Sequence, residues 1–371
     1  MAVRVALDVS AVPAQLTGAG RYVVELAKRL PASGRDVTLV ARRGDEERWR
    51  AWSSAEVVGL VPTGRAARLW YEAWLLGTSE PARAADVWHG PHYTMPHRGA
   101  TPSVVTIHDL TFFTHPQWHE RAKVAYFQRA IHYSARHAAA LIAVSDATAR
   151  LIDELLPGHA PVVTAPHGVD LEAFSLAGDD DANVLERAGF SGAVPYVLFV
   201  GTLEPRKGLD VLIDAFDEVA RERPELELWI AGKAGWGETP DVVRRAGARQ
   251  RIRRLGYVDQ AVLPALMRRA RCVAYPSWAE GFGLPVLEAL ACGAVVVTSA
   301  GTVMEEVAGG HALLATAGDA VSLAAGLVAA DELDEAARAE RAPRARGHAE
   351  HYTWEASVTR HLEAYDLAAR V

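Results

Sequence analysis

The sequence holds only two cysteines among its 371 residues, Cys272 and Cys292. Two cysteines cannot form the disulfide framework of a small secreted domain, and their scarcity suits a reducing compartment. No apolar run reaches the roughly 18 residues of a membrane-spanning helix, and the N-terminus lacks the charged start and long apolar run of a signal peptide. These absences predict a soluble, cytoplasmic protein, while peripheral contact with the inner face of a membrane stays open.

Basic tracts and metal-binding patterns are also missing. The net charge of −7 at pH 7 and the lack of a basic run argue against a nucleic-acid partner. The 14 histidines show no recurring ligand spacing, and the acidic residues 179–181 belong to a polar connector rather than to a metal-binding loop. The sequence therefore predicts neither a bound metal nor another cofactor.

The patterns that are present are those of an α/β protein. Val3–Val9 predicts a buried strand, the apolar positions up to Leu30 predict a helix, and Val37–Val40 predicts a second strand. Such a βαβ opening is typical of a parallel sheet, and Tyr196–Gly201 begins a second one. Because a chain of this length normally forms more than one domain, we expect two Rossmann-like domains with a boundary between residues 175 and 176.

The stretch Ala279–Glu288 carries the clearest chemical pattern, because a strand leads there through a glycine-containing loop into a helix. Glycines let a backbone approach a phosphate, and a helix N-terminus favours negative charge. The carboxylates of Glu280 and Glu288 can accept hydrogen bonds from vicinal hydroxyls. A nucleotide sugar carries all of these groups. Taken alone, Glu288 would more simply be an ordinary acid in the first turn of a helix.

The spacing of Glu280 and Glu288, eight positions apart, resembles the E-x7-E signature of the retaining GT-B glycosyltransferases grouped as glycosyltransferase family 4. The resemblance implies two Rossmann-like domains facing across a cleft, with the nucleotide sugar on the C-terminal domain and the acceptor on the N-terminal one. The last helix, in 352–371, resembles the GT-B helix that crosses back to the first domain. Glu280 would then orient hydroxyls of the transferred sugar and Glu288 would hold the ribose, while the diphosphate would face the backbone of Phe282, Gly283 and Leu284.

Arg206 and Lys207 are predicted at the N-terminal turn of a helix, where the helix dipole disfavours cations. Cations at this unfavourable position indicate either that the side chains are exposed to solvent or that they bind an anion. In the family that the sequence resembles, cations in this loop hold the donor diphosphate. Gly201 belongs to the same expected donor side. Tyr257 lies in a segment resembling the one whose backbone holds the base, although it could equally be a core residue.

Gly18 and Gly20 precede a helix and form a candidate anion site. A dinucleotide-binding role is disfavoured, because Val23 occupies the third glycine position and the loop after the first strand is long. The pair resembles instead the glycine-rich loop that faces the donor diphosphate and the acceptor in the family. Arg21 and Tyr22, which follow in this loop, are expected on the acceptor side. They match a subgroup of the family rich in mannosyl- and rhamnosyltransferases.

Further candidates lie in the N-terminal half. His108 follows the predicted strand Ser103–Ile107, at the edge where parallel sheets bind ligands, and the resemblance places it near the hydroxyls of the donor sugar. His89 and Tyr93 either line the acceptor side or are merely polar loop residues. The aromatic stretch Arg65–Leu76 could form a basic face for a membrane surface, although core packing is the favoured use.

Together these patterns predict a retaining, metal-independent transferase. It would move a hexose, with mannose or rhamnose preferred, from a nucleotide-diphosphate sugar to a hydroxyl of a glycan, a glycolipid or a small molecule. Two alternatives remain, a sugar-nucleotide epimerase of the same fold and a non-catalytic sugar-nucleotide-binding protein.

Overall fold

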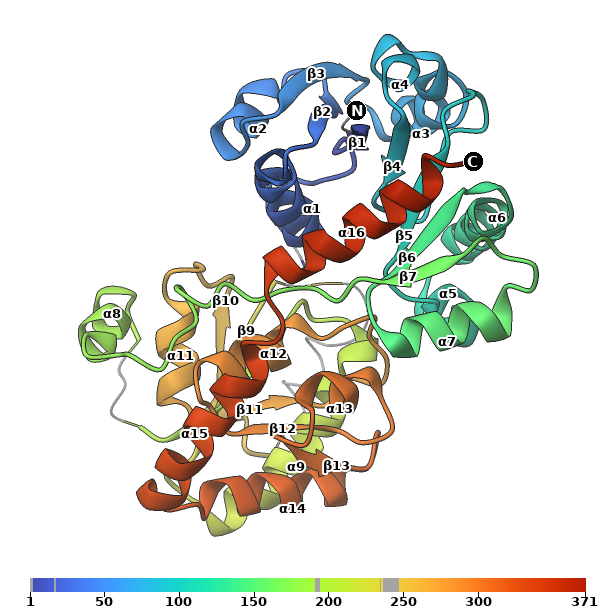
Figure 1. Ribbon diagram of the computed structural model, residues 1–371. Coiled ribbons are helices and arrows are strands. Elements are labelled where there is room, and N and C mark those ends of the chain that lie inside the picture. Colours follow the sequence, from blue (N-terminus) through green and yellow to red (C-terminus); the bar gives the residue numbers. More distant parts are fainter. Residues whose placement is uncertain (1–2, 17, 191–193, 234, 236–246) are drawn as a thin grey trace. The chain divides into compact units, whose positions relative to one another are not determined.

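Figure 1 shows a computed structural model that describes residues 3–16, 18–190, 194–233, 235 and 247–371. The chain divides into two compact units. The first unit comprises Met1–Gly168 and Trp354–Val371, and the second comprises Val169–Thr353. Residues 169–175 and 352–353, which the sequence analysis assigned to the first domain, therefore lie in the second unit.

The first unit is built on a seven-stranded parallel sheet of order β3-β2-β1-β4-β5-β6-β7. Its strands are β1 (Arg4–Asp8), β2 (Asp36–Arg42), β3 (Glu56–Val61), β4 (Val87–Gly90), β5 (Ser103–Ile107), β6 (Ala140–Ala143) and β7 (Val162–Thr164). The helices around it are α1 (Gly18–Arg29), α2 (Glu46–Trp52), α3 (Arg65–Trp74), α4 (Glu80–Ala84), α5 (Thr111–Thr114), α6 (Arg121–His137), α7 (Asp146–Leu155) and α16 (Trp354–Ala368). Short 3-10 helices lie at Pro31–Ser33, Leu76–Thr78 and Pro116–Trp118.

The strands of this sheet are apolar, because helices cover both faces of a parallel sheet and so bury the side chains on both sides of each strand. Both β5 and β6 are buried at every position. The helix α1 turns Tyr22, Val23 and Leu26 into the core. The C-terminal helix α16 contacts α1 and the strands β5 to β7, so the end of the chain completes the first unit.

The second unit contains a six-stranded parallel sheet of order β10-β9-β8-β11-β12-β13. Its strands are β8 (Tyr196–Val200), β9 (Glu227–Ala231), β10 (Ile252–Gly256), β11 (Cys272–Tyr275), β12 (Val296–Ser299) and β13 (Leu313–Ala315). Its helices are α8 (Asp181–Arg187), α9 (Leu209–Glu222), α11 (Leu263–Arg269), α12 (Leu284–Ala291), α13 (Val303–Ala308), α14 (Ala320–Asp331) and α15 (Glu335–Ala349), with 3-10 helices at Pro205–Lys207 and Arg249–Arg251. The helices α9 and α14 pack together and contribute Leu212, Phe216 and Leu327 to the core.

Each sheet has a point where the order of its strands reverses. In the first unit the reversal lies between β1 and β4, and in the second it lies between β8 and β11. In open parallel sheets, ligands bind outside the carboxyl ends of the strands at such reversals. Each unit therefore offers one edge where functional residues are expected.

The aromatic helix predicted in Arg65–Leu76 forms as α3, and only part of this stretch packs into the core as expected. Tyr71 packs against a core cluster that includes Leu76, whereas Trp70, Trp74 and Leu75 keep 58%, 41% and 40% of their surface exposed. The reason is that α3 lies beside β3 at the edge of the sheet, so other parts of the fold cover only some of its sides.

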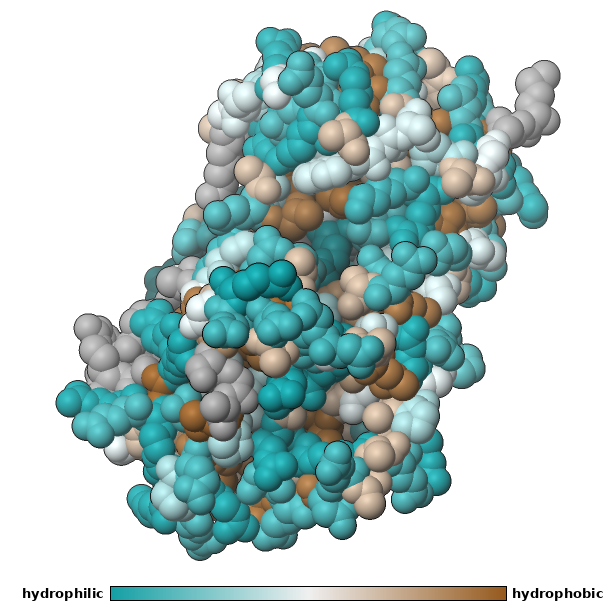
Figure 2. All heavy atoms as spheres, turned by 90° about the vertical axis from the view of Figure 1, so that its left-hand side faces the viewer, coloured by the Kyte–Doolittle hydropathy of each residue, from teal (hydrophilic) through white to brown (hydrophobic). Residues whose placement is uncertain are grey.

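Hydrophobic residues occur in small patches among hydrophilic ones on the face of the molecule in Figure 2. Over the described residues, no helix combines the length and the apolar character needed to cross a membrane.

Candidate active site

Arg206, Lys207 and Glu280 come together at the sheet reversal of the second unit. The strand β8 leads through a loop to the 3-10 helix Pro205–Lys207, and its neighbour β11 leads to the loop before α12. Because β8 and β11 are parallel, both loops leave the sheet at the same carboxyl edge. The helix α9 begins only at Leu209, so the two cations precede that helix rather than lying in its first turn, as the sequence had suggested.

Gly208 lets these two loops meet. Its φ of 64° is left-handed, and a β-carbon at this position would lie 2.2 Å from the carbonyl oxygen of Pro276. Only glycine fits there without strain and collision with backbone. The amide of Trp278 also donates to the carbonyl of Arg206 at 2.9 Å. Backbone contacts therefore fix the side chains that the loops carry.

Glu280 binds both cations in an ion cluster with Glu204 and Tyr275. Arg206 Nη1 donates to Glu280 Oε2 at 2.6 Å, and Lys207 Nζ pairs with Glu280 Oε1. Arg206 Nε also donates to Glu204 at 2.9 Å, and Lys207 Nζ donates to the hydroxyl of Tyr275 at 2.8 Å. The side chains of Lys207, Glu204 and Glu280 are each 9% exposed. Sequence reasoning missed Glu204, although an acid two positions before Arg206 in the same loop was a usable signal.

The charges in this cluster are balanced. Burial opposes ionisation of Glu280, but the charges of Arg206 and Lys207 and their hydrogen bonds outweigh it and lower the pKa of Glu280 to about 2. Burial and the neighbouring Arg206 lower the pKa of Lys207, an effect that Glu280 opposes. Glu280 is therefore a carboxylate at neutral pH. A diphosphate offers the same kind of charged oxygen acceptor, so it can compete with the carboxylates for the two cations.

The candidates around α12 lie next to this cluster. Gly283 has a φ of 95° and directly precedes Leu284, the first residue of the helix. Phe282, in the same loop, is 4% exposed. Glu288 is the fifth residue of α12 and is buried, so its predicted place in the first turn is wrong. The reason is that the left-handed Gly283 ends the loop and lets the helix start ahead of Pro285.

Gly201 and Tyr257 follow β8 and β10 at the same carboxyl edge. The amide of Gly201 donates to the carbonyl of Ala231 at 2.9 Å. The ring of Tyr257 is 53% exposed, with Lys233 Nζ 5.3 Å from its centroid. Tyr257 is therefore not a core residue, and an exposed aromatic ring at this edge is suited to stacking on a planar ligand.

His108 directly follows β5 at the carboxyl edge of the first unit. Its Nε2 lies 2.7 Å from the carbonyl oxygen of Pro91. Because a carbonyl only accepts, Nε2 carries the proton and Nδ1 is an acceptor in the neutral ring. Burial lowers the pKa of His108, which favours this neutral form. The structure thus presents His108 as a fixed acceptor, the form that could receive a hydrogen bond from a hydroxyl.

Tyr93 packs edge-to-face against His108, with ring centroids 5.7 Å apart. Its backbone has a φ of 64°, a left-handed conformation that is unfavourable for a residue of this size. The amide of Tyr93 donates to Thr106 at 3.0 Å, and its carbonyl accepts from the hydroxyl of Ser134 at 2.8 Å. Contacts from the sheet and from α6 therefore hold this loop in place beside His108.

Tyr22 lies in a hydrogen-bonded chain inside the first unit rather than on a surface. His361 Nδ1 lies 2.7 Å from the carbonyl of Ser357, so Nδ1 carries the proton and Nε2 accepts. The hydroxyl of Tyr22 therefore donates to His361 Nε2 at 2.7 Å. Tyr22 must then accept its second hydrogen bond, of 2.8 Å, from the hydroxyl of Thr106.

His89 continues this chain. The hydroxyl of Thr106 donates to Tyr22, so this hydroxyl accepts from His89 Nε2 at 2.8 Å. His89 Nδ1 then lacks a proton and accepts from the hydroxyl of Tyr365 at 2.8 Å. Tyr22 and His89 are fully buried. Neither side chain is accessible to an acceptor in this structure, contrary to the acceptor-side expectation for Tyr22. Of the two alternatives for His89, its burial argues against the acceptor side, and its position in β4 shows that it is not a loop residue. The sequence could not show this, because the partner His361 lies 339 positions from Tyr22.

The glycine-rich segment forms the start of α1. Gly18 is the first residue of this helix and is exposed, whereas Gly20 is buried. An ideal β-carbon on Gly20 would lie 3.5 Å from the side chain of Leu16, which is ordinary contact. Arg21 is partly buried.

A group that the sequence did not indicate lies at the reversal of the first sheet. Ser10 donates its hydroxyl to Glu72 and its amide to Asp8, each at 2.9 Å, and Arg68 donates to Glu72 at 2.7 Å. Burial and the charge of Asp8 raise the pKa of Glu72 to about 7. Glu72 lies within the aromatic helix α3, and nothing in its local pattern marked it. Within the described part of the chain, no group of three or more histidine, cysteine or acidic residues could hold a metal ion.

Comparisons with known proteins cover both units. Residues 16–173 match the family model described as Glycosyltransferase Family 4, and residues 194–330 match the one described as Glycosyl transferases group 1. The O-antigen chain mannosyltransferase B of Escherichia coli is 31% identical over 95% of this chain and 96% of its own length. The chain belongs to glycosyltransferase family 4.

Other relatives of this glycosyltransferase extend the likeness. The D-inositol 3-phosphate glycosyltransferase of Jonesia denitrificans is 28% identical over 94% of this chain and 91% of its own. The structure of HepE from Anabaena in complex with UDP-glucose has a TM-score of 0.77 at 21% identity and covers 100% of both chains. This likeness confirms the predicted GT-B fold. As a member of the family, the glycosyltransferase transfers a sugar from a nucleotide sugar.

Proposed function

We propose that this glycosyltransferase moves a hexose from a nucleoside-diphosphate sugar to an acceptor hydroxyl, with retention of configuration and without a metal ion. The observation that carries the proposal is the pair of partly buried Arg206 and buried Lys207 at the carboxyl edge of the second sheet, beside the loop that enters α12. Mannose is the preferred sugar, supported by Arg21-Tyr22 in the sequence and by the 31% identity to an O-antigen mannosyltransferase.

The chemistry explains why two cations are needed. Breaking the bond between the sugar carbon and the phosphate oxygen leaves a nucleoside diphosphate with one more negative charge. Fixed donors such as Arg206, Lys207 and backbone amides before α12 can stabilise that charge in place of a metal. In the proposed same-face reaction, the acceptor oxygen bonds to the sugar carbon while its proton passes to the departing phosphate oxygen.

Glu280 has two states in this proposal. Without the donor sugar nucleotide it neutralises Arg206 and Lys207, which keeps the buried Lys207 and the partly buried Arg206 paired. When the diphosphate occupies the cations, the carboxylate oxygens of Glu280 become available to accept hydrogen bonds from hydroxyls of the sugar. Glu288, in the buried part of α12, keeps its proposed role at the ribose, and the exposed ring of Tyr257 would stack on the base.

The first unit would supply the acceptor side. His108 offers Nδ1 as an acceptor because Pro91 fixes the proton on Nε2, and this suits a sugar hydroxyl. Tyr93 and Arg21 remain proposed acceptor-side residues. Tyr22 and His89 instead stabilise the interior of this unit, since the polar atoms of both side chains already form hydrogen bonds within it.

Release of nucleoside diphosphate separates the candidate functions. Purified protein is incubated with GDP-mannose, dTDP-rhamnose, UDP-glucose or ADP-glucose, each with and without an alkyl mannoside acceptor and with and without EDTA. We expect release of one diphosphate per glycoside formed, only with acceptor, and unchanged by EDTA. An epimerised sugar nucleotide formed without acceptor would show the epimerase instead, and saturable donor binding without turnover would show a binding protein.

We also propose that α3 lets the protein contact a membrane surface. Trp70, Trp74 and Leu75 are exposed on this helix, and Arg98 lies over the ring of Trp74 at 5.3 Å. Exposed tryptophans beside a cation suit the interface of an anionic bilayer. Flotation with phosphatidylglycerol vesicles should recover the wild type and much less of a Trp70→Ala/Trp74→Ala variant. Equal recovery of both proteins contradicts this role, and phosphatidylcholine vesicles control for charge.

A further inference from the structure

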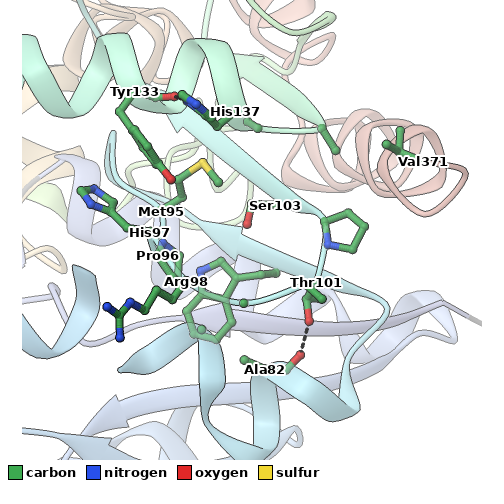
Figure 3. A pocket seen from close by; sticks show the side chains of 17 residues that line it. Ala82, Met95, Pro96, His97, Arg98, Thr101, Ser103, Tyr133, His137 and Val371 are labelled. Atoms are coloured by element: carbon green, nitrogen blue, oxygen red, sulfur yellow. Dashed lines mark hydrogen bonds between the residues drawn. The ribbon is translucent and has the colours of Figure 1, made fainter. Parts of the chain in front are cut away.

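A cavity of about 350 Å³ lies in the first unit at the edge opposite His108. Figure 3 shows it around the amino ends of β5 and β6, between the loop from Met95 to Pro102 and the end of α6. Its volume is within the range of small-molecule sites, which is about 300–1,000 Å³. None of the residues assigned above to donor, acceptor or the ion cluster lines it.

Ser103 is the polar group of the cavity floor. It is the first residue of β5, and only 6% of it is exposed. Figure 3 shows its hydroxyl between the labelled side chains of Met95 and Thr101. The hydroxyl of Thr101 is satisfied by the carbonyl of Ala82 at 2.6 Å, but among the described residues the hydroxyl of Ser103 has no hydrogen-bond partner. A hydroxyl that lines a cavity and has no protein partner can form a hydrogen bond with a polar group of a ligand.

The walls are apolar and in part aromatic. Trp88 lines the cavity and is 2% exposed, while Met95, Pro96 and Tyr133 form one side. Gly77 lets the loop close over this side, because a β-carbon there would lie 1.9 Å from the carbonyl oxygen of Arg98. These surfaces suit a flat or apolar body rather than a free sugar.

The rim is basic. The side chains lining the cavity include His97, Arg98 and His137 and no aspartate or glutamate. The ring of His97 stacks on Tyr133 at 4.2 Å, and Arg98 lies over Trp74, so the rim is held by ring contacts. Burial lowers the pKa of His97, and the charge of His137 lowers it further. Arg98, whose guanidinium stays protonated in proteins, gives this rim a permanent positive charge.

Two further features bear on the charge of the rim. Arg98 has no carboxylate partner among the described residues. Figure 3 places Arg98 at one side of the cavity, on the far side from Val371. An anionic group would therefore be attracted to one end of the cavity, the end that Arg98 marks.

We propose that this cavity binds a small organic anion, with an apolar or aromatic body against Trp88 and Tyr133 and a phosphate or carboxylate group at the Arg98 rim. Ser103 would donate to or accept from a polar atom of the body. Such an anion could be a free metabolite or the headgroup of a lipid. The site is distinct from the donor and acceptor residues, and its occupation does not require sugar transfer.

The test measures binding, so its outcome does not depend on the proposed transferase activity. Phenyl phosphate is titrated against the full chain and followed by NMR or calorimetry, with inorganic phosphate as the probe that lacks the aromatic body. We expect saturable binding of phenyl phosphate at least about tenfold tighter than that of inorganic phosphate. Arg98→Gln and Ser103→Ala should each weaken it, while Arg83→Gln, at an exposed arginine outside the cavity, should not.

Vesicles distinguish the two sources of the anion. If the occupant is a lipid headgroup, phosphatidylglycerol vesicles bind the wild type, Ser103→Leu fills the cavity and weakens that binding, and phenyl phosphate binds weakly or not at all. If it is a free anion, phenyl phosphate binds and Ser103→Leu leaves vesicle binding unchanged. The proposal is overturned if neither phenyl phosphate nor phosphatidylglycerol vesicles bind saturably. It is also overturned if binding is unaffected by Arg98→Gln and by both Ser103 variants in proteins with native circular dichroism.

Discussion

Replacing Glu280 with glutamine tests the ion cluster directly, because the amide keeps the size of the carboxylate, removes its charge and replaces one acceptor oxygen with a donor. The pKa of Glu280 falls from its ordinary 4.5 to about 2. At about 1.4 kcal/mol per pKa unit, this corresponds to about 3 kcal/mol of stability at neutral pH. The side chain is 9% exposed, so solvent screening is small. Removing one partner of a buried ion pair typically costs about 3–5 kcal/mol, which agrees with this magnitude.

The pH dependence has a definite sign. Because the folded pKa of Glu280 is depressed, its contribution is present above about pH 4.5 and is lost as the pH falls through about 2. Urea unfolding of the second unit at pH 7 should therefore show Glu280→Gln about 3 kcal/mol less stable than the wild type. Glu225→Gln, at an exposed glutamate of the same unit, is the matched control and should change little.

Inorganic pyrophosphate separates a structural role from a binding role. If a diphosphate takes the place of the Glu280 carboxylate, the variant should gain more stability from pyrophosphate than the wild type does. A ligand at about 100 times its Kd adds about 2.7 kcal/mol, so the difference is measurable by thermal shift. A variant as stable as the wild type would refute the energetic estimate, and equal pyrophosphate shifts would refute the exchange of partners.

Three other changes test the remaining features. Lys207→Ala should lower kcat by about 10²–10³ while the protein stays folded, because it removes one donor to the leaving diphosphate; unchanged turnover of the purified enzyme contradicts this role. The first unit should lose stability as the pH falls from 6.5 to 4, since burial lowers the pKa of His361 from 6.5 to about 4 and protonation would break the Tyr22 hydrogen bond. His361 alone should account for a loss of about 3 kcal/mol. If the unfolding free energy of a His361→Gln variant falls with pH as steeply as that of the wild type, His361 is not the cause. Between pH 5 and 8, the Glu72→Gln variant should become increasingly stable relative to the wild type. The pKa of Glu72 is raised to about 7 in the folded protein, so the wild type loses stability as this carboxyl ionises. A difference in unfolding free energy between variant and wild type that does not change with pH would contradict the raised pKa.

Much of the fold could be predicted because local pattern specifies it. Strands of a parallel sheet are buried on both faces, so Tyr196–Val200 and Ser103–Ile107 appear as short apolar runs that a helix period does not fit. Glycine and proline mark the loops between strand and helix. The presence of Arg206, Lys207 and Glu280 on such loops, at one edge of the second sheet, follows from these patterns and from the rule that parallel strands share a carboxyl edge.

The tertiary structure decided which of these residues meet. Glu280 lies 74 positions from Arg206, and only the pairing of β8 with β11 brings the two side chains within 2.6 Å. The same holds for Tyr22, which became a buried support because α16 returns to the first unit. Exposure of Trp70 likewise depends on which elements lie beside α3. Local sequence determines the hydrophobic periodicity and the residues of the turns. Burial and ion pairing depend on contacts between segments that are distant in the sequence, and no local pattern of a single sequence shows these contacts.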